Sequence, residues 1–272
     1  FFGRLDYSIL DKYYFDASVR NDACSRFGAN NRNATFWAVG GMWKIKGEDF
    51  LYAVDAVNDL NFKVSYGTQG NASIGNYQHL GLVSTASKYM DTGAKVLSQP
   101  SNPGLTWEQQ ALLTVGINGR FFNMLDVNIE FYNRTTTDML MDVPYNYTTG
   151  FSSLKANVGS LSNRGVDITL GVDILRGRDY WLRASTTFNY NAEKVTSLFN
   201  GLDRWEMTGY GLAYVVGKPV MFYAPIYAGI DPADGAPMWY LPGENVDETT
   251  MNETTKDFDE ASLTQNTGLR YT

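Results

Sequence analysis

The stretch Val166-Asp167-Ile168-Thr169-Leu170-Gly171-Val172-Asp173-Ile174 decides the fold class of this protein. Its even positions are all aliphatic, and Asp, Thr or Gly occupies every odd position. Successive side chains of a β-strand point to opposite faces of the sheet, so this period of two predicts a strand with one apolar and one polar face. After a short polar break the alternation restarts over residues 180–191, and the two segments together predict a long hairpin.

The same period of two continues along most of the chain. It is clear in two further segments and weaker in four others, at residues 13–20, 126–132, 3–10, 35–45, 61–66 and 107–118. No repeat at a fixed period of about 20 to 50 residues is present, which disfavours a propeller. We therefore predict an all-β protein made of antiparallel strands.

The connections between these segments alternate between short and long. The short ones lie near residues 11–12, 119–124 and 176–179, residues 46–60 are intermediate, and the long ones are 21–34, 67–106, 134–162 and 192–218. Transmembrane β-barrels have short turns at one end and long loops at the other, and strands of about ten residues suit a tilted crossing. We predict an antiparallel transmembrane β-barrel segment. A soluble β-sandwich is the alternative, although loops of about 30 residues are uncommon in compact soluble domains.

Aromatic residues gather near the predicted strand ends, as girdles at two membrane interfaces would. They include Tyr13, Tyr14, Phe15, Phe36, Trp37, Phe121, Phe122, Tyr180 and Trp181. Trp107 is predicted to be a further girdle anchor, and the glycine block at residues 67–71 is predicted to form a turn. We expect Cys24 to be a small buried or loop thiol and His79 to be solvated in a long loop.

Composition and motifs exclude several classes of function. The 272 residues include 22 basic and 29 acidic side chains, a net charge of −7, so no nucleic-acid partner is expected. The single cysteine and single histidine cannot supply a zinc site. No Gly-x-Ser-x-Gly or His-Glu-x-x-His motif occurs, and we expect no enzyme activity. Residues 231–235 lack the ligand spacing of an EF-hand, so a plain turn is favoured over calcium and no cofactor is expected.

The polar faces of three predicted strands offer candidate contacts for a solute in the lumen of the barrel. Hydrogen-bonding groups interspersed with aromatic rings suit sugars or peptides. The candidates are Asp126, Asn128, Glu130, Tyr132, Asp167, Asp173, Trp181, Arg183 and Asn189. The alternative is that these groups only solvate the interior and pair across strands.

Several phrases follow one another in a particular order along the chain. They include Gly3-Arg4-Leu5-Asp6-Tyr7, Ser18-Val19-Arg20, Lys63-Val64-Ser65-Tyr66-Gly67, Asn102-Pro103-Gly104-Leu105, Phe131-Tyr132-Asn133-Arg134, Asn163-Arg164-Gly165 and Val216-Gly217-Lys218-Pro219. In this order they resemble the SusC/RagA-type TonB-dependent transporters of Bacteroidetes outer membranes. Residues 21–24 depart from the family, because Asn-Asp-Ala-Cys stands where Asp-Gly-Ser is usual.

The resemblance implies a 22-stranded barrel closed by an N-terminal plug. Residues 1–272 would be an internal part of the barrel domain, without the plug, the TonB box and the last strands. The protein would import oligosaccharides or oligopeptides through the outer-membrane lipid, with a SusD-like surface lipoprotein and energy from the TonB–ExbB–ExbD complex. The acidic region after Pro242 would be a solvated extracellular loop. The alternatives are a soluble or surface β-rich glycan-binding module and a siderophore receptor of the same barrel class.

Overall fold

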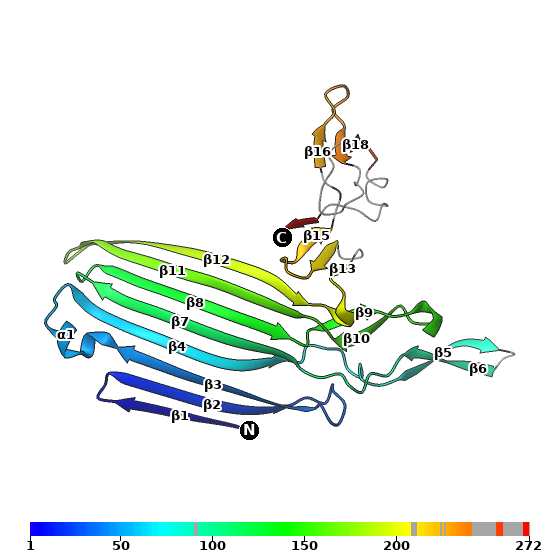
Figure 1. Ribbon diagram of the computed structural model, residues 1–272, viewed down its shortest axis with the longest axis horizontal. Coiled ribbons are helices and arrows are strands. Elements are labelled where there is room, and N and C mark those ends of the chain that lie inside the picture. Colours follow the sequence, from blue (N-terminus) through cyan, green and yellow to red (C-terminus); the bar gives the residue numbers. More distant parts are fainter. Residues whose placement is uncertain are drawn as a thin grey trace. The chain divides into compact units, whose positions relative to one another are not determined.

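A computed structural model describes residues 1–89, 92–207, 211–223, 225, 227–240, 254–257 and 269–271. The chain divides into two compact units, residues 1–192 and 193–272 (Figure 1). Almost all regular structure is β-strand, and within the described residues no helix has the length and hydropathy needed to cross a membrane. The predicted all-β class is confirmed.

An eight-stranded antiparallel sheet forms the first unit (Figure 1). Each strand pairs with the next one of the sheet, in the order β1 (Phe2–Ile9), β2 (Tyr13–Ala23), β3 (Asn33–Lys44), β4 (Val57–Asn71), β7 (Glu108–Phe121), β8 (Leu125–Thr137), β11 (Ser160–Arg176) and β12 (Trp181–Ser197). All eight strands that the alternation predicts are present. The 22-strand count stays a prediction.

One end of the sheet carries short connections, which we call the short-turn end. Residues 10–12 join β1 to β2, with φ values of 54° and 52° at Leu10 and Asp11, and residues 122–124 join β7 to β8, with φ values of 54° and 57° at Phe122 and Asn123. Positive φ at both central residues is the geometry of two-residue hairpins whose twist matches the strands. The predicted turn at residues 11–12 lies within the first of these connections. The β3–β4 connection holds the 3₁₀ turn η1 (Ile45–Gly47) and the helix α1 (Asp49–Tyr52).

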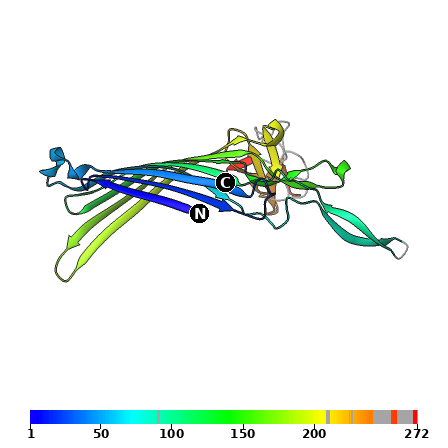
Figure 2. The same cartoon turned by 90° about the horizontal axis from the view of Figure 1, so that it is seen from below.

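The other end carries the long connections, and two of them contain hairpins that the sequence did not reveal. Strands β5 (Leu82–Tyr89) and β6 (Thr92–Gln99) pair within the β4–β7 connection, and Figure 2 shows this hairpin projecting beyond the sheet. Strands β9 (Leu140–Pro144) and β10 (Ser153–Asn157), with the 3₁₀ turn η2 (Tyr147–Thr149) between them, pair within the β8–β11 connection. The predicted alternation of short and long loops is confirmed.

The principal buried core of the first unit lies among these long connections. It consists of Phe27, Phe36, Ile74, Leu105 and Trp107. The ring of Trp107 lies 5.4 Å from that of Phe27 and 5.8 Å from that of Phe36, and its Nε1 donates to the carbonyl of Arg32 over 3.1 Å. The predicted girdle roles of Trp107 and Phe36 are therefore wrong, because both rings pack inward against loop residues.

The glycine block at residues 67–71 is strand and not the predicted turn. Gly70 has no side chain because the ring of Phe36 occupies the space a Cβ would need, and a Cβ on Gly67 would come within 2.8 Å of the Ala38 Cβ. Cys24 packs half-buried against the core, as expected. His79 is not simply solvated, because its Nδ1 lies 2.9 Å from the Arg26 carbonyl oxygen.

Residues 21–23, where the sequence departs from the family pattern, continue strand β2. Asn21, Asp22 and Ala23 pair directly with Thr35, Ala34 and Asn33 of β3. An extended strand needs no glycine, so the departure leaves this part of the fold intact.

The second unit contains small sheets. One sheet consists of β13 (Arg204–Met207), β14 (Leu212–Val215), β15 (Met221–Tyr223) and β19 (Leu269–Tyr271). The other consists of β16 (Tyr227–Ile230), β17 (Pro237–Tyr240) and β18 (Thr254–Thr255). The 3₁₀ turn η3 (Phe199–Gly201) precedes both sheets in the sequence. Trp205 packs between Phe199 and Tyr214, at ring distances of 5.1 and 5.7 Å. Most of the acidic region after Pro242 lies outside the described residues.

Candidate functional site

The two faces of the eight-stranded sheet differ sharply in chemistry. Directly paired residues of antiparallel strands point to the same face. One continuous row is Tyr7, Phe15, Gly41, Val64, Val115, Phe131 and Val166, and the next is Ile9, Tyr13, Trp43, Phe62, Ile117, Ile129 and Ile168. We call this the apolar face. Its large side chains remain exposed within the chain, with Phe131 at 43% and Leu170 at 37%.

Aromatic residues border the apolar face at both ends. Trp37 and Tyr66 lie side by side near the long loops, with ring centroids 5.5 Å apart. At the short-turn end Tyr13 is paired with Trp43, and both donate a hydrogen bond to Oε1 of Glu48. Tyrosine and tryptophan with their polar atoms turned away from an apolar band are typical of a membrane interface.

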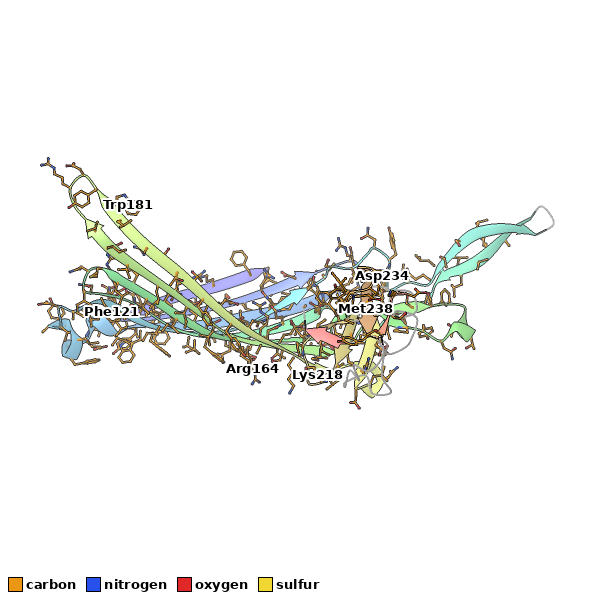
Figure 3. All side chains as sticks on the ribbon, turned by 90° about the horizontal axis from the view of Figure 1, so that it is seen from above. Phe121, Arg164, Trp181, Lys218, Asp234 and Met238 are labelled. Carbon is orange, nitrogen blue, oxygen red and sulfur yellow. The ribbon has the colours of Figure 1, made fainter. Side chains whose placement is uncertain are left out.

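The opposite face is polar, and it carries the predicted solute contacts. Asp126, Asn128, Glu130 and Tyr132 alternate along β8 and pair with Gly171, Thr169, Asp167 and Gly165 of β11. Asp173 continues the β11 series, and Arg183 and Asn189 of β12 contact Asp173 and Asp167. Trp181 lines a hollow with Arg120 and Arg183, near the tip of the β11–β12 hairpin (Figure 3). All nine predicted residues therefore share one face, on which Asn128 lines a hollow with Asp126 and Thr169.

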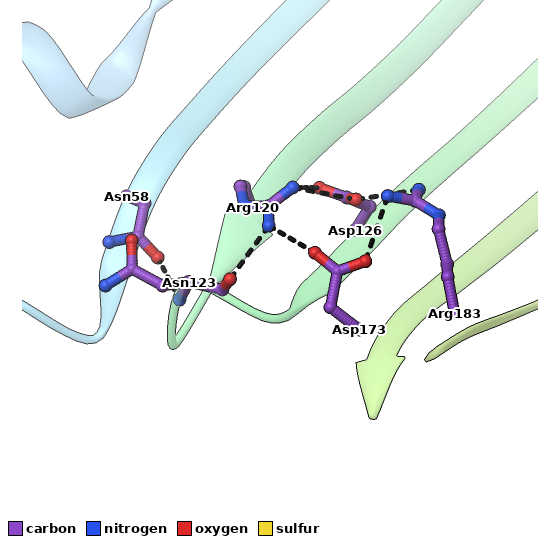
Figure 4. A network of polar contacts seen from close by, with 6 residues as sticks. All are labelled: Asn58, Arg120, Asn123, Asp126, Asp173 and Arg183. Carbon is purple, nitrogen blue, oxygen red and sulfur yellow. Dashed lines mark hydrogen bonds and ion pairs between the residues drawn. The ribbon is translucent and has the colours of Figure 1, made fainter. Parts of the chain in front are cut away.

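Four charged residues form a closed ring near the short-turn end, which we call the charge ring (Figure 4). Arg120 contacts Asp126 over 3.1 Å and Asp173 over 2.6 Å, while Arg183 contacts the same two carboxylates over 2.8 and 3.3 Å. Gly171 makes this possible, because a Cβ there would lie 2.7 Å from the Arg183 guanidinium. The ring links four neighbouring strands and neutralises each charge, which favours a structural role for Asp126, Asp173 and Arg183.

A polar groove lies nearer the long loops on the same face. It has a volume of about 560 Å³ and is lined by Leu112, Thr114, Glu130, Tyr132, Arg134, Asn163, Asp167, Asn189 and Asn191. Tyr132 donates to the side-chain oxygen of Asn191 over 3.1 Å, and Asn189 donates to Asp167. Within the part of the chain that the structure describes, the side chains of Glu130 and Arg134 have no hydrogen-bond or ion-pair partner. Their two charges are therefore unpaired within the described residues.

Glycines on the neighbouring strands leave room for side chains of the groove to lie against the sheet. A Cβ on Gly116 would lie 3.0 Å from the Cγ of Glu130, and a Cβ on Gly165 would overlap the ring of Tyr132. Arg134, Asn163 and Asn191 also line the groove and were not among the predicted residues. The signal for Arg134 was present, because it extends the even-numbered series of β8 by one step.

No group of three or more His, Cys, Asp and Glu side chains that could hold a metal ion occurs among the described residues. Asp231 and Asp234, the acidic pair of the predicted turn, both contact the Lys256 ammonium, over 2.5 and 2.7 Å. The hydrogen bonds from Lys256 lower the pKa of both carboxyls. The same contacts raise the pKa of Lys256.

A sheet with an exposed apolar face, aromatic borders and a polar opposite face is the wall of a transmembrane β-barrel. The family model for TonB dependent receptor-like β-barrels matches residues 1–271. This chain therefore belongs to the TonB-dependent receptor β-barrel family, a family of outer-membrane transport receptors. The resemblance drawn from the sequence is confirmed, and the apolar face is the lipid-facing side.

Individual relatives agree with this membership. The chain is 33% identical over 210 residues to TonB-dependent receptor P39 of Formosa agariphila and 32% identical over 213 residues to TonB-dependent receptor SusC of Bacteroides thetaiotaomicron, covering 77% and 75% of this chain. It spans only 20% and 21% of those proteins. The RagAB peptide importer in its open-open state matches 99% of this chain and 28% of its own, with 40% identity and a TM-score of 0.84. As a member of this family, the chain is an outer-membrane protein.

Proposed function

We propose that the full-length protein is an outer-membrane nutrient importer of the SusC type, which takes up oligosaccharides or oligopeptides without changing them chemically. One observation carries this proposal. The same sheet has an exposed apolar face and an opposite polar face, and the polar face carries two charged side chains without ionic partners among the described residues, Glu130 and Arg134. Such a wall faces lipid on one side and a wet lumen on the other. In the full-length protein we propose that it continues into a 22-stranded barrel with a plug.

The polar groove is the proposed contact for the solute. Its amide side chains and the Tyr132 ring suit the hydroxyls and apolar faces of a sugar, and they also suit peptide groups. Glu130 and Arg134 add one charge of each sign, which a neutral sugar does not need and a peptide can use. The charge ring, whose charges are mutually paired, is proposed to support the wall, and only Trp181 beside it would reach a solute.

Partners of the whole protein are proposed from its relatives. RagAB is described as a peptide importer, and SusC as a TonB-dependent receptor. By this analogy we propose a SusD-like surface lipoprotein over the long loops and energy from the TonB–ExbB–ExbD complex. No cofactor is proposed, because the Lys256 ammonium already contacts both carboxylates of the turn, Asp231 and Asp234.

The test is uptake by cells that carry the full-length receptor and its neighbouring lipoprotein gene. Glu130→Gln and Arg134→Gln should lower uptake of the solute on which a deletion strain fails to grow. Arg164→Gln is a matched control, because Arg164 lies on the adjacent strand and points to the opposite face, where it contacts Asn133. Parental uptake by both groove variants would contradict the proposed contact.

Two other functions make different predictions. A soluble glycan-binding module would be recovered without detergent, and the bare apolar face argues against it. A siderophore receptor would be induced by iron-restricted growth and would leave growth on glycans and peptides unaffected by deletion.

A further inference from the structure

The connection between β3 and β4, at the short-turn end, has regular structure and is not an extended loop. We call residues 45–56 the foot (Figure 1). It begins with η1, passes through Glu48 and forms the single turn of α1, in which the amides of Leu51 and Tyr52 donate to the Glu48 carbonyl over 3.0 and 2.9 Å. A four-residue helix is too short to be stable by itself in water. Other contacts must therefore hold it.

The carboxylate of Glu48 fastens the start of the foot to the lipid-facing side of the sheet. Oε1 accepts hydrogen bonds from the Tyr13 hydroxyl over 2.7 Å and from the Trp43 indole over 3.0 Å, and Oε2 contacts the Lys12 ammonium over 3.2 Å. Tyr13 and Trp43 belong to the aromatic border of the apolar face. The bond from Tyr13, followed by that from Trp43, lowers the pKa of the Glu48 carboxyl, so the clamp is ionised at neutral pH.

A lysine closes the other end of the foot. The Lys46 ammonium donates to the carbonyls of Leu51, Tyr52 and Val54 over 3.0, 3.2 and 2.8 Å. The carbonyl of Tyr52 is one that the end of a helix leaves without an intrahelical donor, while those of Leu51 and Val54 also accept from the amides of Val54 and Val57. With its three donors used, Lys46 fixes the shape of the foot and leaves its apolar side chains in the open.

Those apolar side chains are exposed at the level of the membrane interface. Phe50 is 68% exposed and Tyr52 76% exposed within the chain. The four helical residues rise only about 6 Å along the helix axis. Both rings therefore stay close to the depth in the membrane at which Glu48 and its two aromatic partners lie. The interfacial region of a bilayer is itself about 5 to 7 Å thick on each side.

We propose that the foot is an interfacial anchor, in which Phe50 and Tyr52 insert among the phospholipid headgroups at the short-turn end while Glu48 clamps the segment to the barrel wall. The occupant is a lipid surface because the foot is continuous with the lipid-facing side through Tyr13 and Trp43. Exposed aromatic rings beside a charged clamp are the composition of segments that lie in the membrane interface. By the loop asymmetry of such barrels this surface is the periplasmic leaflet.

The test uses the full-length receptor in nanodiscs of phosphatidylethanolamine and phosphatidylglycerol. Single cysteines replace Phe50 or Tyr52 in a cysteine-free background and carry a nitroxide, whose relaxation by oxygen and by a water-soluble nickel chelate is compared. Leu170→Cys on the lipid-facing side and Tyr77→Cys, 63% exposed in a long loop, set the two limits. All four positions are at least 37% exposed, so labelling does not require the core to open.

We expect oxygen-to-nickel ratios at positions 50 and 52 several-fold above the ratio at Tyr77 and below that at Leu170. Adding Glu48→Gln should lower the ratio at position 50 toward that at Tyr77, because the amide binds the Lys12 ammonium and the two donors more weakly. Ratios at positions 50 and 52 equal to that at Tyr77 would overturn the anchor. An unchanged ratio in the Glu48→Gln background would overturn the clamp.

Discussion

Substitution of Leu170 distinguishes a lipid-facing wall from a packed protein core. Leu170 lies at the middle of the apolar side of β11, opposite Val127, and 37% of its surface is exposed within the chain. Its neighbour Thr169 points the other way, opposite Asn128, into a hollow of about 530 Å³ that Asp126 and Arg183 also line. The two positions therefore share a strand and a depth but differ in face.

The three substitutions are expected to lower the free energy of unfolding by different amounts. Arginine at Leu170 would place a charge near the bilayer midplane, at a cost of roughly 2 to 4 kcal/mol. Arginine at Thr169 should cost under about 1 kcal/mol, because water and the carboxylate of Asp126 can solvate it. Leu170→Ala should also cost under about 1 kcal/mol, since acyl chains refill the space, whereas in a packed core it would cost about 2 to 5 kcal/mol.

The assay is reversible unfolding of the full-length receptor in bilayers, with the free energy of unfolding measured for Leu170→Ala, Leu170→Arg and Thr169→Arg. A large loss for Leu170→Arg beside small losses for the other two is the expected pattern. A loss of several kcal/mol for Leu170→Ala would instead show that protein packs against this face and that the face does not meet lipid.

Three further predictions concern other parts of the molecule. Arg120→Leu should lower the melting temperature more than Arg4→Leu, because Arg120 joins two carboxylates of the charge ring while the Arg4 pair is mostly exposed. Gly70→Ala should cost about 1 to 3 kcal/mol by overpacking the loop core, and Gly3→Ala should be near neutral in the same thermal assay. The turn at residues 231–235, held by Lys256, should resist limited proteolysis at neutral pH. Because the pKa values of its two carboxyls are lowered, it should lose that resistance only below the ordinary aspartate pKa. If Lys256→Met were cleaved at neutral pH no faster than the parent protein, this prediction would be contradicted.

The strands could be predicted from the sequence because their signal is local. Every second residue of residues 166–174 is aliphatic, and a lipid-facing strand needs no other information. The faces followed from the same parity, which is why all nine candidate residues lie on one side of the sheet.

The loop core could not be predicted, because its contacts join segments far apart in sequence. Trp107 follows a long loop just as a girdle anchor would, and nothing nearby indicates that Phe27 and Phe36 will pack against it. The block around Gly70 looked like a turn for the same reason, since only the distant ring of Phe36 explains its missing side chain.

Only part of the candidate site could be predicted from the sequence. Parity identified Glu130 and Tyr132 as inward-facing, but it could not say which charges would be free. The structure separates them, because Asp126 and Asp173 both contact Arg183 and Arg120, and Arg120 lies one residue before the end of β7, on a different strand from its partners.

The most direct test of the account is a cysteine scan along the centre of β11 in the full-length receptor, with Cys24 replaced by serine. Each of Asp167, Ile168, Thr169 and Leu170 is changed to cysteine in turn and exposed in nanodiscs to a water-soluble maleimide. We expect labelling at positions 167 and 169 and protection at 168 and 170, because odd positions face the wet lumen and even positions face acyl chains. Labelling without this alternation, or with the opposite parity, would contradict it.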